Sequence, residues 1–149
     1  MDLITEFWQW LGMSKEKYIF KMENPQNSSI DFEEYMFPKW SALLDEAREN
    51  IREERLEPES LEKVLTVMAL DNETEDVLDF IVENASDNYI EKFVQYGVLS
   101  ILYHARWQIA EILGRRQPRN WENLIDELVK DENAYVSKRA ANIRNNKAE

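Results

Sequence analysis

The sequence predicts an all-α fold, and three observations lead to that prediction. The chain has 149 residues but only three glycines and four prolines, so few positions interrupt regular structure. Leu, Glu, Ala and Lys, which favour helices, are frequent, and long alternating runs of β-branched residues are missing. Hydrophobic residues make up 44% of the chain, which is enough to build a buried core. We expect a single domain over residues 1–149.

Residues 1–57 are rich in aromatic side chains and differ from the rest of the chain. Five apolar residues near the N-terminus recur at helical spacing and predict an amphipathic helix. Nine of the 17 aromatic residues lie in this region. The helical stripe consists of Leu3, Ile4, Phe7, Trp8 and Leu11, and the nine aromatics are Phe7, Trp8, Trp10, Tyr18, Phe20, Phe32, Tyr35, Phe37 and Trp40.

A polar loop and a longer helix are expected in the second part of this region. Residues 21–31 are polar and end at Asp31, which has the spacing of a helix N-cap with Glu34. A helix is predicted from Pro38 to about Arg55. Because a repeat array needs a cap over its terminal repeat, we interpret residues 1–57 as an N-terminal helical cap.

Residues 58–146 contain a repeat of about 30 residues. The apolar positions of residues 90–98 recur 31 residues later and 29 residues earlier. Two helices per period are typical of an α-solenoid, so we expect three helical hairpins at 58–84, 88–114 and 119–146. The equivalent positions are Leu61, Val64, Leu65, Met68 and Ala69; Ile90, Phe93, Val94, Gly97 and Val98; and Trp121, Leu124, Ile125, Leu128 and Val129.

Residues that commonly end helices fall near these boundaries. Gly114 is predicted to form a left-handed C-cap, and Asn145 occupies the equivalent position one repeat later. Two pairs have the spacing of a capping box, in which an N-cap and a residue three positions on bond each other's backbone. These pairs are Asn72 with Glu75 and Asn88 with Glu91.

The segment from Arg106 to Gly114, RWQIAEILG, resembles the second helix of a HEAT repeat of the PBS-lyase type. That helix has the pattern Val-Arg, two variable residues, Ala-Ala, one variable residue and Ala-Leu-Gly. Residues 124–131 and the following Tyr-Val at 135–136 resemble the first helix of the next repeat and its Asp-containing turn. The resemblance is good over residues 88–146, moderate over 58–84 and absent before about residue 57. A tetratricopeptide array is the alternative, but its Trp and Pro positions are not met.

The resemblance implies a short right-handed α-solenoid whose second helices line a concave, partner-binding surface. Small residues at Ala110, Ala140 and Ala141 are expected to let neighbouring helices approach closely. Ala105 and Ser137 depart from the family pattern, which has Val and Arg there. Neighbouring HEAT repeats are commonly linked by a ladder of Asp-to-Arg ion pairs, and these two departures argue against a complete ladder in this chain.

Negative charge is concentrated in the middle of the chain. The net charge is −12, and residues 61–88 carry 8 acids against 1 base. Glu75, Asp76, Asp79 and Glu83 are expected on one exposed helical face, either as an acidic ridge that binds a basic protein or as an ordinary solvated face. Trp107 and Tyr135 fit equally well as exposed anchors or as core, whereas Trp121 is predicted to be core. The predicted partner-binding residues are Glu75, Asp76, Asp79, Glu83, Trp107, Glu111, Tyr135 and Lys138.

The sequence contains no recognisable catalytic, cofactor or metal-binding pattern. Cysteine is absent, and His104 is the only histidine, so we interpret it as structural and expect no metal and no catalytic residue. Asp76 and Asp79 could in principle act as a glycosidase pair, but such spacing occurs on most exposed helices. A basic cluster at 115–119 fits a helix C-terminus, and the net negative charge argues against nucleic acid. The cluster consists of Arg115, Arg116 and Arg119.

The expected function is non-catalytic protein binding. A small acidic module of this kind suits an inhibitor or immunity protein that neutralises a basic enzyme. The alternatives are a scaffold or accessory protein of an enzyme complex and, less favoured, a HEAT-like DNA-repair or lyase-type enzyme. The N-terminus has neither a basic signal-peptide region nor a long apolar span, so a cytoplasmic protein without membrane contact is expected, with a monomer as the default.

Overall fold

A computed structural model describes residues 2–23 and 34–147. Within these two ranges the chain consists of nine α-helices and one short 3-10 helix, and no strand occurs there. The predicted all-α class is therefore confirmed. The predicted N-cap at Asp31 and most of the loop at 21–31 lie outside the described residues. None of the described helices is long and apolar enough to cross a membrane.

The chain forms two compact units, Met1–Glu46 and Ala47–Glu149, and the boundary falls inside a helix. The first unit is built around Phe7, which is completely buried and lies within 6.5 Å of four other aromatic rings. Those rings belong to Trp8, Trp10, Phe37 and Trp40. The elements of this unit are α1 (Leu3–Leu11), α2 (Lys15–Glu23), η2 (Glu34–Met36) and the first part of α3 (Trp40–Arg52).

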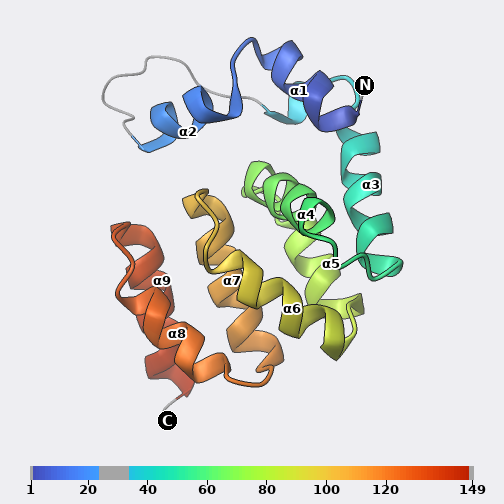
Figure 1. The fold of residues 1–149 in the computed structure, drawn as a ribbon. Coiled ribbons are helices and arrows are strands. Elements are labelled where there is room, and N and C mark those ends of the chain that lie inside the picture. The colour runs from blue at the N-terminus through green and yellow to red at the C-terminus, as the bar shows by residue number, and fades with distance from the viewer. Residues whose placement is uncertain (1, 24–33, 148–149) are drawn as a thin grey trace. The chain divides into compact units, whose positions relative to one another are not determined.

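The second unit contains the end of α3 and three further pairs of helices. Figure 1 shows the α4–α5 pair and the α8–α9 pair on opposite sides of α7, which packs against α4, α5, α6, α8 and α9. Helices α5 and α9 therefore both contact the same central helix. The six helices are α4 (Pro58–Leu70), α5 (Asp76–Asn84), α6 (Asp87–Gly97), α7 (Tyr103–Arg116), α8 (Trp121–Val129) and α9 (Ala134–Lys147).

The core of the second unit follows the repeated apolar positions. All five of those positions in α4 are buried, as are four of the five at residues 90–98. In α8 only Ile125 and Leu128 are buried, and Trp121, which we predicted to be core, is only half-buried. Helix α8 packs against α7 and α9, so part of its surface stays open to solvent.

The predicted helix C-caps at Gly114 and Asn145 are wrong. Helix α7 continues to Arg116 and ends at Gln117, which adopts the left-handed conformation with φ of 48°. Gly114 lies inside the helix and is buried, and a Cβ atom there would stand 2.8 Å from Cγ2 of Ile143. The glycine therefore permits close approach of α9. Asn145 likewise lies inside α9, which runs to Lys147.

The two predicted capping boxes are also wrong. Helix α6 is capped by Ser86, whose Oγ accepts a hydrogen bond from the backbone N–H of Tyr89 at 3.1 Å. Helix α5 begins after Glu75, and the buried carboxylate of Asp71 accepts from the backbone N–H of Val77 at 3.0 Å. Burial raises the pKa of Asp71 above its ordinary value. The hydrogen bonds that Asp71 accepts from Thr74 and Val77 therefore only partly offset the desolvation of its carboxylate.

Candidate protein-binding surface

Three acidic side chains project from α5 into solvent. Asp76, Asp79 and Glu83 are spaced by three and four residues, which places them on one side of the helix. All three are exposed, while Val77, Leu78 and Ile81 on the opposite side are completely buried. Glu75 differs from the other acids because it forms the N-cap of α5 and is half-buried. The prediction of an exposed acidic face is therefore confirmed for Asp76, Asp79 and Glu83 but not for Glu75.

A chain of ion pairs runs from α5 across α7 to α9. Asp79 pairs with Arg115 at 3.2 Å, and Arg115 lies 3.9 Å from Glu111 on the same helix. Glu111 in turn accepts two hydrogen bonds from Arg139, from Nε at 3.1 Å and from Nη2 at 2.5 Å. The side chain of Glu111 is only 18% exposed, so its bonds with Arg139 are better shielded from water than the outer pair.

Arg139 also packs against two aromatic rings. Its guanidinium carbon lies 4.5 Å from the ring centre of Trp107 and 5.6 Å from that of Tyr135. Nη1 of Arg139 donates to the Tyr135 hydroxyl at 2.9 Å. Burial disfavours the charged form of Arg139, but the bonds and charge of Glu111 and Tyr135 raise its pKa overall. The cation is therefore held firmly in place.

The structure resolves the exposure of the two aromatic residues. Trp107 is 4% exposed and its ring contacts Arg139 and Tyr135, so a partner would contact those two residues rather than the indole. Tyr135 is 44% exposed and meets Trp107 edge to face. Only Tyr135 offers a large accessible aromatic surface at this position.

His104 is hydrogen-bonded to Trp107, the aromatic residue on which Arg139 packs. The indole Nε1–H of Trp107 donates to Nδ1 of His104 at 2.9 Å, which requires the neutral form of the imidazole. Burial lowers the pKa of His104 to about 4. Among the described residues no group of three or more His, Asp or Glu side chains is arranged to hold a metal ion.

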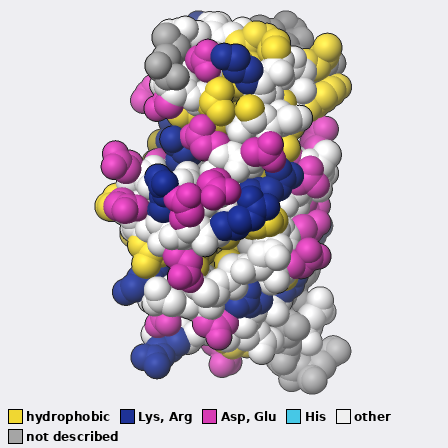
Figure 2. All heavy atoms as spheres, turned by 90° about the vertical axis from the view of Figure 1, so that its right-hand side faces the viewer, with side chains coloured by type: hydrophobic (Ala, Val, Ile, Leu, Met, Phe, Trp, Pro, Cys, Tyr) yellow, Lys and Arg dark blue, Asp and Glu magenta, His cyan; other side chains and the backbone are white. Residues whose placement is uncertain are grey.

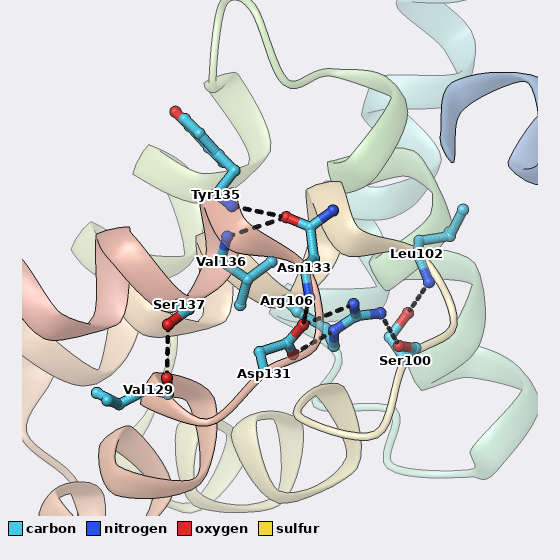
Figure 3. Close-up of polar contacts among 9 residues, drawn as sticks. All are labelled: Ser100, Leu102, Arg106, Val129, Asp131, Asn133, Tyr135, Val136 and Ser137. Carbon is cyan, nitrogen blue, oxygen red and sulfur yellow. Dashed lines mark hydrogen bonds and ion pairs between the residues drawn. The ribbon is translucent and has the colours of Figure 1, made fainter. Parts of the chain in front are cut away.

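A buried ion pair joins α7 to the α8–α9 turn (Figure 3). Arg106 donates to both carboxylate oxygens of Asp131, from Nε at 2.7 Å and from Nη2 at 3.0 Å. Nη1 of Arg106 also donates to the backbone carbonyl of Ser100 at 2.8 Å. The two side chains are 10% and 9% exposed. An Asp-to-Arg link between neighbouring hairpins is therefore present here.

The same close-up shows how α9 is held at its start. Asn133 Oδ1 accepts from the backbone N–H groups of Tyr135 and Val136, at 3.0 and 3.1 Å. Ser137 Oγ donates to the carbonyl of Val129 at 2.5 Å. This serine, at a position where the HEAT-repeat pattern predicts Arg, bonds the end of α8. These contacts fix the rotation of α9 and hence the direction of Tyr135 and Arg139.

Arg116 forms hydrogen bonds with the free carbonyls at the C-terminus of α5. Its Nη1 donates to the carbonyls of Val82 and Ala85 at 3.2 and 2.8 Å, at the C-terminus of α5, where carbonyls lack helical partners. Its Nη2 pairs with Asp87 at 2.8 Å. Together with the ion pairs of Arg115, these bonds occupy two of the three guanidinium groups of the predicted basic cluster.

We define the second-helix surface by eight side chains on α5, α7 and α9. Ion pairs and hydrogen bonds link five of them, Asp79, Arg115, Glu111, Arg139 and Tyr135. The predicted partner-binding residues did not include Arg115 or Arg139. Arg139 could have been found, because it follows Tyr135 by four residues and so shares its helical face. Figure 2 shows one face of the molecule, on which acidic and basic side chains are interspersed rather than separated into large patches. The eight residues are Asp76, Asp79, Glu83, Glu111, Arg115, Tyr135, Lys138 and Arg139.

The geometry thus describes an all-α protein with a charged surface that contains one exposed tyrosine, built on three helices. Comparison with known proteins adds no family: no family model matches the chain, and no match was found among curated proteins or solved structures.

Proposed function

We propose that this protein is a non-catalytic binding module that docks a basic protein partner on the second-helix surface. The observation that carries the proposal is the set of exposed acids on α5, of which Asp76 and Glu83 form no ion pair with any described residue. Exposed, uncompensated carboxylates attract a basic partner over a distance and speed its association. An inhibitor or immunity protein that covers a basic enzyme is the role that best fits this charge.

The proposed architecture is a short right-handed α-solenoid of HEAT-like hairpins. The three helix pairs α4–α5, α6–α7 and α8–α9 support it, as does the buried Arg106–Asp131 link from α7 to the α8–α9 turn. In such an array, α5, α7 and α9 are the second helices of their hairpins. The contacts of α7 with both α5 and α9 agree with that arrangement. The surface would then be the concave, partner-binding face.

Nucleic acid is disfavoured as a partner. Phosphate contacts require accessible Lys or Arg side chains. Arg115 is paired with Asp79 and Glu111, and Arg116 is bonded to α5 carbonyls and Asp87. The net charge of −12 adds a general repulsion.

A charge-reversal pull-down tests the proposal. The wild-type protein and an Asp76→Lys/Glu83→Lys variant are used to capture a partner from an extract of the source organism. An equivalent Glu122→Lys/Glu127→Lys variant on α8 changes the net charge by the same amount, at exposed acids outside the surface. We expect the α5 variant to lose about tenfold or more in affinity, because both lost attractions become repulsions, whereas the α8 variant retains the partner.

The salt dependence separates the inhibitor from the scaffold role. Capture in about 0.15 M salt that weakens near 1 M supports electrostatic docking of a basic protein. A partner retained unchanged near 1 M salt instead supports an accessory scaffold. Equal loss in both charge variants would show that net charge alone drives capture, and the surface would then have no specific role.

A further inference from the structure

The second-helix surface carries uncompensated charges of opposite sign at its two ends. On α5, Asp76 and Glu83 are exposed and unpaired within the described ranges. On α9, Lys138 is exposed and likewise has no ion pair with a described residue. The charges between these ends compensate one another in pairs. Those inner side chains are Asp79, Arg115, Glu111 and Arg139.

The positive end of the surface combines an exposed lysine with an exposed tyrosine on α9. Lys138 follows Tyr135 by three residues and Arg139 follows it by four, so the two cations flank Tyr135 on its side of α9. Tyr135 is 44% exposed, and its hydroxyl is already bonded to Arg139. Arg139 itself is engaged by Glu111, which leaves Lys138 as the accessible cation beside an aromatic ring.

We propose that the partner segment is itself dipolar, with basic residues that meet α5 and a carboxylate that meets Lys138 on α9. This inference rests on the proposed function and specifies the partner's chemistry. Packed helices have axes about 8–10 Å apart, so α5 and α9, separated by α7, are roughly 16–20 Å apart. An extended segment covers that distance in about six residues. Because the two ends of the segment carry opposite charges, it would bind across the surface in one direction only.

Two synthetic peptides test the proposal in a titration at about 50 mM salt, followed by NMR shifts of the ¹⁵N-labelled protein. Both peptides are acetylated and amidated, so that their termini are uncharged. One, KKGSGSEE, separates its charged pairs by the required distance, and the other, KKGSGSGG, carries only the two lysine charges. Because the protein's net charge is −12, general attraction favours the lysine-only peptide. We expect the opposite order: the dipolar peptide binds about threefold tighter, as one added charge pair allows.

Charge variants locate the two ends. Lys138→Glu is expected to weaken the dipolar peptide about fivefold without weakening the lysine-only peptide, while Lys92→Glu, at an exposed lysine of α6, leaves both unchanged. The proposal is overturned if the lysine-only peptide binds as tightly as the dipolar one, if neither binds, or if both lysine variants act alike.

The outcome for the dipolar partner is distinct from that for the proposed function. If the lysine-only peptide binds tighter and Asp76→Lys/Glu83→Lys abolishes its binding, acidic docking stands and only the dipolar partner fails. If that α5 variant weakens neither peptide, the acidic surface itself fails.

Discussion

Asp131 shows how much a single buried charge contributes to the second unit. Its carboxylate is 9% exposed and holds Arg106 through two hydrogen bonds. Asp131→Asn leaves the Arg106 guanidinium buried without a counter-charge, so we expect the free energy of unfolding to fall by about 3 kcal/mol. Urea denaturation followed by circular dichroism measures this change.

Asp126 provides the matched control for that substitution. It pairs with Arg144 at 3.4 Å, but both side chains are about half exposed, at 55% and 48%. Asp126→Asn is therefore expected to change the stability by less than about 0.5 kcal/mol. Similar losses in the two variants would mean that the buried pair contributes no more than a surface pair.

His104 should make stability depend on pH. Burial lowers its pKa to about 4 in the folded protein, below the value of about 6.5 in an unfolded chain. Between these values the unfolded state binds more protons, so stability falls as pH is lowered through this window and levels off below pH 4. From pH 7 to pH 5 we expect a loss of about 2 kcal/mol that a His104→Gln variant does not show.

Comparison with the variant isolates the histidine from other titrating groups. The raised pKa of Asp71 acts in the opposite direction, since it gives stability at low pH that is lost as pH rises through its folded pKa. Asp71 is present in both proteins, so its contribution cancels in the difference. Parallel pH profiles for wild type and His104→Gln would show that the imidazole is not buried in the neutral form.

At the scale of the helices, Gly114 sets how closely α7 and α9 approach. An added Cβ would lie 2.8 Å from Cγ2 of Ile143, a methyl carbon on a β-branched side chain whose χ1 angle has little freedom. Overpacking costs about 1–3 kcal/mol, whereas Ala in place of Gly inside a helix gains about 1 kcal/mol. We therefore expect Gly114→Ala to lower the free energy of unfolding by about 1 kcal/mol net, as measured by urea denaturation.

An Ile143→Ala background tests the cause. With the opposing side chain removed, the same Gly114→Ala change should stabilise the protein by about 0.5–1 kcal/mol, because only the helix propensity remains. Destabilisation of equal size in both backgrounds would contradict the close approach and favour a conformational need for glycine at this position.

The helix pairs could be predicted from the sequence because apolar spacing records which side of a helix is buried. The helix ends could not. A glycine near the end of a periodic segment serves equally as a left-handed cap or as a contact point, and only the position of Ile143 on α9 decides for Gly114. Asp71 caps α5 from six residues before Val77, a spacing that no capping-box pattern contains.

The outward direction of the acids on α5 could be predicted, because Asp76, Asp79 and Glu83 alternate with buried residues of the same helix. The partners of those acids could not. One residue changes direction by 100° around a helix, so the repeat register selected Lys138, whereas Arg139 is the side chain that reaches Glu111. Contacts between helices depend on their rotation, which Asn133 and Ser137 fix through bonds to the backbone.

Charge distribution over the whole molecule predicts weak affinity for DNA. The net charge is −12. Arg115 is paired with Asp79 and Glu111, and Arg116 donates to Asp87 and to carbonyls of α5. We expect no retarded band when a short DNA duplex is run with about 10 µM protein at about 50 mM salt, where non-specific binders are usually retained. A basic DNA-binding protein run on the same gel confirms that the assay detects binding.

A retarded band would contradict this prediction, and two arginine variants would then show where the DNA is bound. Arg119 is exposed and, unlike Arg115 and Arg116, forms no ion pair with a described residue. Arg119→Ala, compared with Arg144→Ala at an exposed arginine of α9, therefore distinguishes a local phosphate site from general attraction. Retention abolished by Arg119→Ala alone would mean that local geometry overcomes the net repulsion, and the acidic surface would then no longer define the partner. Absence of retention would agree with the proposal that the partner is a basic protein.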